Sequence, residues 1–484
     1  MFAAVDLGSN SFRLHIGQPE GNGMRIVRTA REPVRLAAGL TRELLLTEQA
    51  MSTALACLAN FRSLLAEYPL SAVRVVATSA LRSARNAGAF LPLAEQAIGQ
   101  PIEIISGEEE GRLIYMGVAT TFEHDNERCL VVDIGGGSTE VVLGHGSRIH
   151  QVESFSIGTQ PQASRFFADG RITADAFDGA VLAARSFFED AAPLYRPQHW
   201  DRAYGTSGTM RAMANTIAKS GIGDGTLSYK NLLALKTRLI ACGHVERVNL
   251  PGLKPERVVA LVGGLAVLLG VMEELQVPGL EAINAGLRMG VLHDLQLRAT
   301  RHDRREESVQ EFMRRFGVDG ARARRVARMA GLLYGQLADA DSQYGNYLHW
   351  SALLHEIGQT ISHTQFHKHG AYIVEHADLP GFTRTEQKLI ASMVLGHKGN
   401  LRKLGEDLGD AELVRALLAL RLATLFMHGS ADADIGTASL RIKKQIELEL
   451  DAEWRQRHPT LSYMLEKERE WWREVGLSMQ LKFK

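Results

Sequence analysis

The residues best suited to chemistry lie between Val131 and Leu143, where an acid and a run of glycines separate two apolar runs. In order, the turn holds Asp133, Ile134, Gly135, Gly136, Gly137 and Ser138. A turn without side chains exposes its backbone N–H groups, and clustered N–H groups bind phosphate. Asp133, at the end of the first run, can hold a divalent cation over that phosphate. The alternative is an ordinary β-hairpin with a glycine-rich turn.

The first residues of the chain repeat this design around Asp6. The polar turn that follows consists of Gly8, Ser9, Asn10 and Ser11. Short, β-branched apolar runs on both sides of each turn predict strands. Two hairpins with an acid at the same point predict two related α/β halves that face one cleft, where a phosphate is held from both sides.

Two further segments place hydroxyl groups where an expected strand leads into an expected helix. The first is residues 77–82, which ends at Arg82, and the second is residues 205–209, which contains Ser207 and Gly208. A helix start attracts anions because its first N–H groups are unpaired and the helix dipole is positive there. Taken alone, Arg82 is more simply a solvated helix residue.

Three consecutive acids, Glu108 to Glu110, follow Ser106 at the start of another expected helix. A serine N-cap with a negative first turn suits the helix dipole, and this explains the acids without any function. The functional interpretation is a general base. Hydrolysis of a phosphoanhydride needs a carboxylate that orients and deprotonates a water molecule.

The composition limits the class of protein. The chain of 484 residues has 55 basic and 55 acidic side chains, so a polyanion would have to meet a local basic surface. The three cysteines lack metal-site spacing and are typical of reduced thiols in a cytosolic protein. The chain starts on an expected strand, and the apolar run from Val258 to Met272 is shorter than the roughly 20 residues that span a bilayer. We therefore expect a soluble cytoplasmic protein of several domains.

Several motifs in order resemble the exopolyphosphatase and guanosine pentaphosphatase family, within the superfamily of actin, sugar kinases and Hsp70. The resemblance rests on residues 5–11, 77–82, 106–112, 133–138 and 205–209, and continues into the C-terminal half. It implies a duplicated α/β core of the ribonuclease H type, followed by further domains. Alignment with the family's Glu-Glu-Ala-Arg segment implies that Glu110 is the catalytic base, with Glu109 as the alternative.

The resemblance also assigns roles around this base. It implies that Asp133, with Asp6 through a water molecule, holds Mg²⁺, and it leaves open whether a monovalent cation such as K⁺ is needed. Arginine at the position of Arg82 contacts the terminal phosphate in the family. Where the family usually has acids, this chain has Val259 and Met289. The other residues expected to bind phosphate are Asn10, Ser11, Gly135, Gly136, Gly137, Ser138, Ser207 and Gly208.

Four domains are expected. Residues 1–124 and 125–298 would form the two actin-like halves, and a charged run over residues 298–307 without apolar periodicity would end the second half. Residues 303–430 resemble an all-helical HD-like domain. Residues 431–484 alternate as strand, strand, helix and strand, which predicts a small α+β domain.

The HD-like segment departs from a working metal site. There an aspartate follows the histidine and bridges metal ions, whereas here Glu356 follows His355. Because a complete ligand set cannot be assembled, we expect this domain to be free of metal. Its dense arginines, among them Arg325, form either a solvated helix face or a basic lining for a long anion. The residues best placed to contact such a polyanion are His367, Lys368 and His369.

These roles, as the resemblance implies them, predict a homodimeric exopolyphosphatase that releases orthophosphate from the end of linear inorganic polyphosphate. The closest rival is hydrolysis of guanosine pentaphosphate, which uses the same core and needs a purine pocket in addition. A kinase of the superfamily would need an adenosine site near Gly263, and a nucleotide-dependent scaffold would show no turnover. Neither a nucleic acid nor a membrane is expected as a partner.

Overall fold

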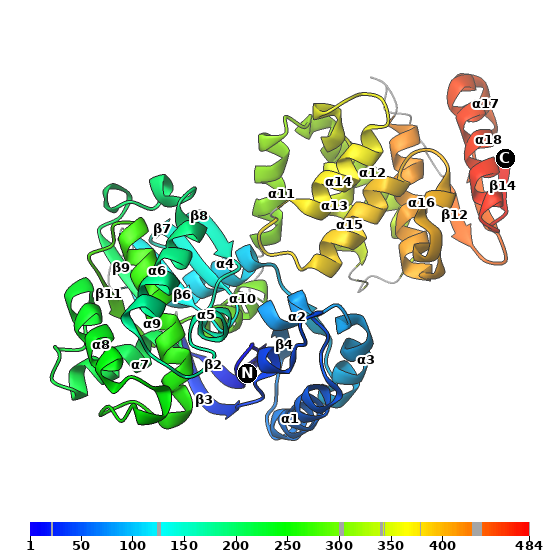
Figure 1. The fold of residues 1–484 in the computed structure, drawn as a ribbon. Coiled ribbons are helices and arrows are strands. Elements are labelled where there is room, and N and C mark those ends of the chain that lie inside the picture. Colours follow the sequence, from blue (N-terminus) through cyan, green and yellow to red (C-terminus); the bar gives the residue numbers. More distant parts are fainter. Residues whose placement is uncertain are drawn as a thin grey trace. The chain divides into compact units, whose positions relative to one another are not determined.

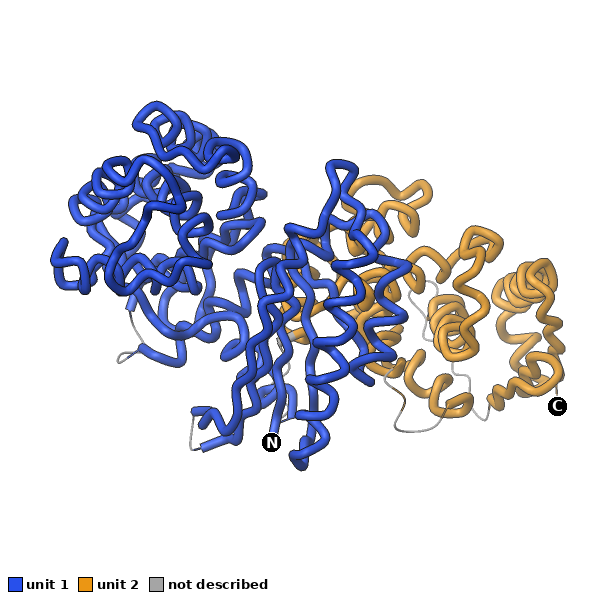
Figure 2. The backbone as a smooth tube through the Cα atoms, turned by 60° about the horizontal axis from the view of Figure 1, so that its bottom comes forward, with its two compact units in different colours: residues 1–302 blue, residues 303–484 orange. Residues whose placement is uncertain are grey.

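The computed structural model describes residues 1–20, 23–122, 127–299, 304–338, 342, 344–377, 379–427 and 438–483. Its internal contacts divide the chain into two compact units, unit 1 with residues 1–302 and unit 2 with residues 303–484 (Figure 2). The finer division of the chain into four domains stays a prediction.

The first sheet of unit 1 has the strand order β3-β2-β1-β4-β5. β1 (Phe2–Leu7), β2 (Phe12–Glu20) and β3 (Gly23–Glu32) form an antiparallel meander. β4 (Ala72–Ala77) and β5 (Ile102–Ile104) continue in parallel from β1. One face packs against α1 (Glu48–Ala66) and α3 (Ala87–Ile98) in a common core. α1 begins after Thr47, whose side chain caps the helix by accepting a hydrogen bond from the Ala50 N–H group.

The second sheet repeats the first. Its order is β10-β11-β9-β6-β7-β8, in which β6 (Arg128–Ile134), β7 (Thr139–His145) and β8 (Arg148–Phe155) form the meander. β9 (Arg202–Thr206) and β11 (Gly279–Ala282) continue in parallel from β6, and β10 (Leu227–Ser228) is an added antiparallel edge. Strand order and direction therefore match in both sheets, and unit 1 is the duplicated actin-like core that the twin hairpins predicted.

Helices α5 (Thr159–Phe166), α6 (Ala174–Phe188), α7 (Gly208–Lys219), α8 (Tyr229–Cys242) and α9 (Val258–Glu274) share one core with a face of the second sheet (Figure 1). In the described part of the chain, one helical stretch, Pro255–Glu274, is long and apolar enough to cross a membrane. Of its most apolar window, 72% is buried inside the fold, as in a core helix.

α4 (Gly107–Ala119) and α10 (Leu287–Ala299) share a core with the remaining faces of both sheets (Figure 1). The two helices pack backbone against backbone. A side-chain carbon at Gly290 of α10 would overlap the carbonyl of Leu113 in α4, and one at Gly117 of α4 would overlap that of Gly286. Glycine is therefore required where the two helices meet.

Unit 2 begins with six α-helices and ends with a small sheet. The helices are α11 (Arg304–Arg315), α12 (Gly320–Tyr334), α13 (Tyr344–Leu354), α14 (Phe366–His376), α15 (Arg384–Gly396) and α16 (Ala411–Phe426). The sheet holds β12 (Ser439–Ile442), β13 (Ile446–Leu450) and β14 (Met479–Phe483), with α17 (Ala452–Arg457) and α18 (Pro459–Glu474) before the last strand. The three predicted strands and the long helix before the last one are present, and the short helix α17 was not predicted.

One helix is shorter than the sequence predicts. Its apolar spacing predicts a helix from Ile172 to Leu194, whereas α6 ends at Phe188 and residues 192–194 form a separate 3-10 turn. The charged run over residues 298–307, which was predicted as a domain boundary, contains the division between the two units, and its last residues form the first turn of α11. Long-range contacts fix that turn, since Arg305 forms an ion pair with Glu386 at 2.6 Å.

Candidate active site

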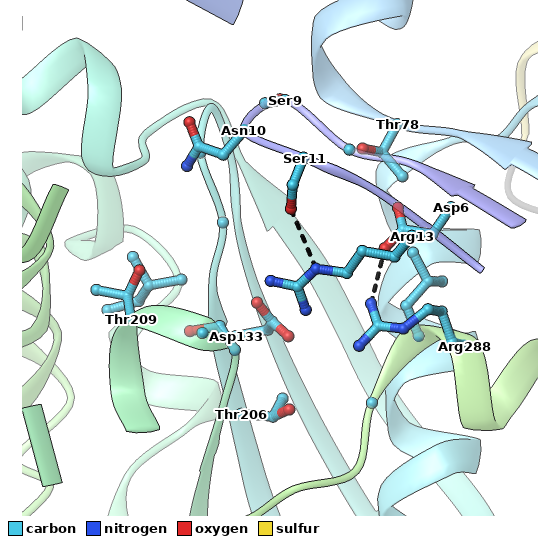
Figure 3. A pocket seen from close by; sticks show the side chains of 18 of the residues that line it. Asp6, Ser9, Asn10, Ser11, Arg13, Thr78, Asp133, Thr206, Thr209 and Arg288 are labelled. Carbon is cyan, nitrogen blue, oxygen red and sulfur yellow. Dashed lines mark hydrogen bonds and ion pairs between the residues drawn. The ribbon is translucent and has the colours of Figure 1, made fainter. Parts of the chain in front are cut away.

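A cavity of about 700 Å³ in unit 1 is walled by the turns that follow β1, β4, β6 and β9 and by the first turns of α4, α7 and α10. In open α/β sheets, ligands bind beyond the carboxyl ends of the strands, and this cavity lies there in both halves. Figure 3 shows side chains from the two hairpins pointing into one space. The cleft between related halves was predicted from the paired hairpins.

The glycine turn after β6 lies directly against the serine turn after β1. A side-chain carbon at Gly136 would lie 2.7 Å from Ser9 Cβ, and one at Gly137 would lie 2.5 Å from Ser79 Oγ. Glycine alone permits this approach. The backbone of one turn and the hydroxyls of the other therefore meet in one place, which suits a phosphate held from two sides.

Glu110 lies in the first turn of α4 and lines the cavity. The helix is capped by Ser106, whose side chain accepts a hydrogen bond from the Glu109 N–H group at 3.1 Å, so the N-cap predicted from the acids is confirmed. The Glu110 residue is 8% exposed, and burial raises the pKa of its carboxyl to about 7. A carboxyl group with a pKa near neutrality is suited to take a proton from water.

The other nearby charges act on Glu110 in opposite senses. Arg82, from α2 (Ser79–Ser83), donates from Nη1 to Glu110 Oε2 at 3.2 Å and from Nη2 at 3.3 Å. Its positive charge lowers the pKa of Glu110, whereas the charges of Asp6 and Asp133 raise it. The structure thus places Arg82 on the expected base, and the contact with phosphate that the resemblance implies stays a prediction.

Asp133 and Asp6 end the central strands of the two hairpins and line the same cavity. Burial raises the pKa of Asp133 to about 6, Arg13 lowers it and the charge of Asp6 raises it. Asp6 Oδ2 accepts a hydrogen bond from Arg288 Nη1 at 2.9 Å (Figure 3). A cation between two such carboxylates would remove the repulsion that raises the pKa.

Among the described residues, no group of three or more His, Cys, Asp or Glu side chains could hold a metal ion by itself. Mg²⁺ is commonly bound by one or two carboxylates together with substrate phosphates and water. Asp133 and Asp6 therefore fit Mg²⁺ as an ion that arrives with a phosphate substrate.

Glu140 is a buried acid next to Asp133, and sequence reasoning assigned it no role. It lies opposite Asp133 in the β6–β7 ladder, so both side chains share one face of the sheet. Burial and the charges of Glu110 and Asp133 raise the pKa of Glu140 well above its ordinary value. Its Oε1 accepts a hydrogen bond from Ser154 Oγ at 2.8 Å. The hairpin register, with Glu140 seven residues after Asp133, could have found it.

A set of arginines, here called the arginine collar, lines the cavity on both sides. Arg13 and Arg288 extend into the space that Asp133 faces (Figure 3). Arg13 Nε donates to Ser11 Oγ at 3.1 Å. Sequence reasoning missed the collar because its members are scattered along the chain and gather only in the fold. The collar consists of Arg13, Arg31, Arg35, Arg211, Arg257 and Arg288.

His15 is a neutral member of the cavity wall. Burial and the charges of Arg288 and Arg13 lower its pKa to about 3, so it carries no charge near neutral pH. Its Nε2 accepts a hydrogen bond from Arg288 Nε at 3.2 Å. His15 therefore orients Arg288 without changing the charge of the cavity.

The junction of β9 and α7 has the strained backbone of a binding turn. Ser207 has a φ of 109°, a region that favours glycine, and its side chain caps α7 by accepting from the Met210 N–H group. Ser207 and Gly208 both line the cavity, as do the predicted residues Asn10 and Ser11. The structure thus brings the predicted phosphate-binding residues of these turns together at the cavity. Arg82 is the exception, because its guanidinium group is bound to Glu110.

Gly263 and Gly264, near which a kinase would need its adenosine site, are packed against neighbouring residues. A side-chain carbon at Gly263 would overlap the Thr159 carbonyl of α5, and one at Gly264 would lie 2.5 Å from Thr209 Cγ2. Both glycines are buried where α9 contacts its neighbours. This part of α9 therefore serves the core.

The residues predicted for a polyphosphate track lie in unit 2. His367, Lys368 and His369 are in the first turn of α14, and Arg325 is in α12. Burial, then Lys403 and Lys368, lower the pKa of His367 to about 4. Glu356, which stands where a working HD site has its metal-bridging aspartate, forms an ion pair with Arg322, with 3.1 Å between Oε1 and Nη2. A track across these residues stays a prediction.

Known phosphatases are similar to this chain in sequence and fold. The model of the Ppx/GppA phosphatase family matches residues 16–299, and that of Ppx/GppA phosphatase domain III matches residues 304–469. Among solved structures, an exopolyphosphatase from Cytophaga hutchinsonii is 25% identical with a TM-score of 0.55, over 61% of this chain and 97% of its own. A Ppx/GppA enzyme from Aquifex aeolicus is 26% identical with a TM-score of 0.52, over 60% of this chain and 98% of its own.

Proposed function

Because the chain belongs to the Ppx/GppA phosphatase family and is a hydrolase of phosphoanhydride bonds, we propose that its substrate is linear inorganic polyphosphate. It would release orthophosphate from the chain end. The observation that carries the proposal is a buried carboxyl group, Glu110, with a pKa near neutrality, in a cavity that also holds glycine turns and the arginine collar.

The arginine collar supports a substrate with many negative charges. Six arginines line the cavity, against four acids, Asp6, Glu110, Asp133 and Glu256. Mutual repulsion contributes to a lowered pKa of Arg13, Arg31 and Arg211, after burial as the main cause. Such crowding is relieved when phosphate oxygens pair with the guanidinium groups. A chain of phosphates would satisfy more of the collar than a single phosphoryl group.

Glu110 would take a proton from a water molecule that attacks the terminal phosphorus. The bond from that phosphorus to the bridging oxygen then breaks, and the shortened chain leaves with its electrons. Asn10, Ser11 and the turn from Gly135 to Ser138 would orient the terminal phosphoryl group. When bound, Mg²⁺ at Asp133, with Asp6 through water, would supply positive charge for the phosphoryl oxygens.

The second candidate is hydrolysis of guanosine pentaphosphate. The observation that favours it is that the wall of the same cavity includes apolar residues, among them Ile26 and Ala260, besides its charged ones. The apolar side chains would pack against a purine ring. The polyphosphate proposal needs no such contact.

Phosphate release separates the two candidates. Orthophosphate would be measured with Mg²⁺ from long-chain polyphosphate and, in parallel, from guanosine pentaphosphate, for the parent protein, Glu110→Gln and Glu109→Gln. Fast release from polyphosphate that collapses in Glu110→Gln supports the proposal. Release from the nucleotide alone selects the second candidate, and wild-type activity in Glu110→Gln shows that Glu110 is not the base.

We also propose that the protein is a homodimer, as the resemblance implies, and that it is cytoplasmic and has no nucleic acid or membrane partner, as its composition indicates. Sedimentation of the full chain tests the dimer. A kinase would instead transfer phosphate between ATP and an acceptor hydroxyl, and a scaffold would release none. Both rivals are excluded if polyphosphate is hydrolysed without a nucleotide.

A further inference from the structure

A buried network of charged side chains lies beside the cavity in unit 1. At its centre, the side chains of Arg74 and Arg112 are each 2% exposed, Glu109 is 3% exposed and Asp294 is 6% exposed. The described residues that line the cavity include none of its members. The network balances three arginines with three acids: Arg74, Arg112, Arg298, Glu103, Glu109 and Asp294.

Asp294 of α10 is the point where the network converges. It accepts hydrogen bonds from Arg74 Nη1 of β4 at 2.8 Å and from Arg112 Nη2 of α4 at 3.0 Å. Arg298 Nε, one turn further along α10, donates to it at 2.7 Å. A single carboxylate thus ties together β4, α4 and α10, which are far apart in the sequence.

Glu109 joins the same network next to the expected base. Arg112 grips it with two bonds, from Nε at 2.6 Å and from Nη2 at 2.7 Å, and Arg74 Nη2 lies 3.5 Å from its Oε1. Glu109 and Glu110 are consecutive in the first turn of α4, so their side chains leave the helix on different sides. Fixing Glu109 against β4 and α10 therefore sets the rotation at which α4 presents Glu110.

Each tied element delivers a residue of the cavity. β4 leads to Thr78 and Ser79, which line the cavity, and α10 carries Arg288, which lines it and binds Asp6. A buried ion network is often less stabilising than apolar residues of the same volume, so stability alone is a weak reason for one here. Its position favours a role in orientation.

We propose that Asp294 is a positioning residue for hydrolysis, which holds the first turn of α4 so that Glu110 points at the attacking water. The inference rests on the proposed role of Glu110. Asp294 acts through Arg112 and Glu109 and does not itself contact the substrate. Loss of its charge leaves Arg74 and Arg112 to compete for Glu109, and the first turn of α4 shifts.

The test compares Asp294→Asn with the parent protein, and Asp294→Asn/Glu110→Gln with Glu110→Gln, in polyphosphate hydrolysis with Mg²⁺. A small misplacement of a catalytic group costs up to about 100-fold in rate, so we expect kcat to fall about 10- to 100-fold in Asp294→Asn. We expect KM to change less than about threefold, because the cavity wall keeps its residues. In the Glu110→Gln background, Asp294→Asn should not lower kcat further, because the carboxylate that Asp294 positions is already absent.

A matched control removes an equally buried carboxylate elsewhere. Glu468→Gln in unit 2 loses the partner of Arg421, a pair whose side chains are 4% and 1% exposed, and kcat should be retained. If Asp294→Asn does not fold, Arg112→Lys keeps the charge but loses the paired bonds to Glu109, and the same pattern is expected. Unchanged kcat, an equal loss in both backgrounds, or an equal loss in Glu468→Gln overturns the inference while the proposed function stands. A parent protein that hydrolyses no phosphoanhydride overturns both.

Discussion

Glu110 is held between effects of opposite sign. Burial and the charges of Asp6 and Asp133 raise its pKa, while Arg82, 3.2 Å from its Oε2, lowers it. A base must be deprotonated to accept the proton of water, so Arg82 sets the fraction of enzyme that is ready to react. The role that follows for Arg82 is adjustment of the base, besides any contact with phosphate.

Replacement of Arg82 by glutamine should move the acid limb of the pH–rate profile to higher pH. Without the guanidinium, burial and the neighbouring acids act unopposed and the pKa of Glu110 rises above about 7. A shift of one unit would lower the rate about tenfold on the acid limb and leave it unchanged at high pH. The measurement is kcat/KM for phosphate release across pH.

The control for this change is Arg85→Gln, which alters an exposed arginine three residues further on. Its profile should match that of the parent protein. A rise in KM for Arg82→Gln at every pH, with the acid limb in place, would instead assign Arg82 to the phosphate alone.

Replacement of Glu140 by glutamine should stabilise the protein at pH 8 and lower its activity. A carboxyl whose pKa is raised by folding contributes stability at low pH and loses it as pH rises through the folded-state value. Glu140, Glu110 and Asp133 are all of this kind, so the free energy of unfolding should fall as pH rises through their folded-state pKa values. A glutamine at this position has no proton to lose, so the free energy of unfolding of the variant at pH 8 should exceed that of the parent protein.

Thermal unfolding at pH 8 without Mg²⁺ compares the stability of Glu140→Gln with that of the parent protein. A cation added to the parent protein should reduce the difference in stability between the two proteins. Glu281→Gln, an exposed position on β11, is the control and should change little. A Glu140→Gln protein that is less stable at pH 8 than the parent would mean that its hydrogen bond from Ser154 outweighs the repulsion.

At the scale of elements, the sequence predicted strands and turns better than the contacts between helices. The hairpins around Asp6 and Asp133 were predictable because alternating apolar residues and turn glycines are local signals. The arginine collar was not, because its members come from segments far apart in the chain, and Glu140 becomes apparent only when the register of the β6–β7 hairpin is worked out. The packing of α4 on α10 leaves no periodic signal, since it depends on single glycines that face another backbone.

Replacement of Gly290 by alanine should therefore destabilise unit 1. The added carbon would overlap the Leu113 carbonyl, which belongs to a helix backbone and cannot rotate away. Overpacking of this kind costs about 3 kcal/mol, and activity should fall as Glu110 and Arg288 separate. Chemical denaturation and phosphate release on the same samples give both values.

Gly331→Ala is the matched control because that glycine lies in α12 with no atom near the added carbon. Its helix should gain about 0.8 kcal/mol from the better propensity of alanine. Equal stability of the two variants would show that α4 and α10 can separate without cost.

At the scale of the whole molecule, charge is balanced overall and concentrated locally. The chain has 55 basic and 55 acidic residues, yet six arginines converge on one cavity of unit 1. Long-range attraction of a polyanion is therefore weak, and binding depends on contacts at the cavity. The duplicated core explains this arrangement, because each half contributes turns and arginines to the same space.

Binding of polyphosphate should consequently weaken as the salt concentration rises, while kcat should stay the same. Raising the ionic strength from about 0.1 M to about 1 M shortens the screening length from about 10 Å to about 3 Å. We expect KM to rise about five- to tenfold for each phosphate held by the collar, with kcat unchanged. Arg257→Gln, which removes one collar charge, should raise KM at low salt and flatten the dependence. Arg128→Gln, in an exposed ion pair with Asp201, should do neither.

The length of the substrate gives a second test of the collar. A substrate of only a few phosphates reaches fewer arginines, so its KM should depend less on salt than that of a long chain. Equal salt dependence for both lengths would mean that the collar binds only the reacting end of the substrate.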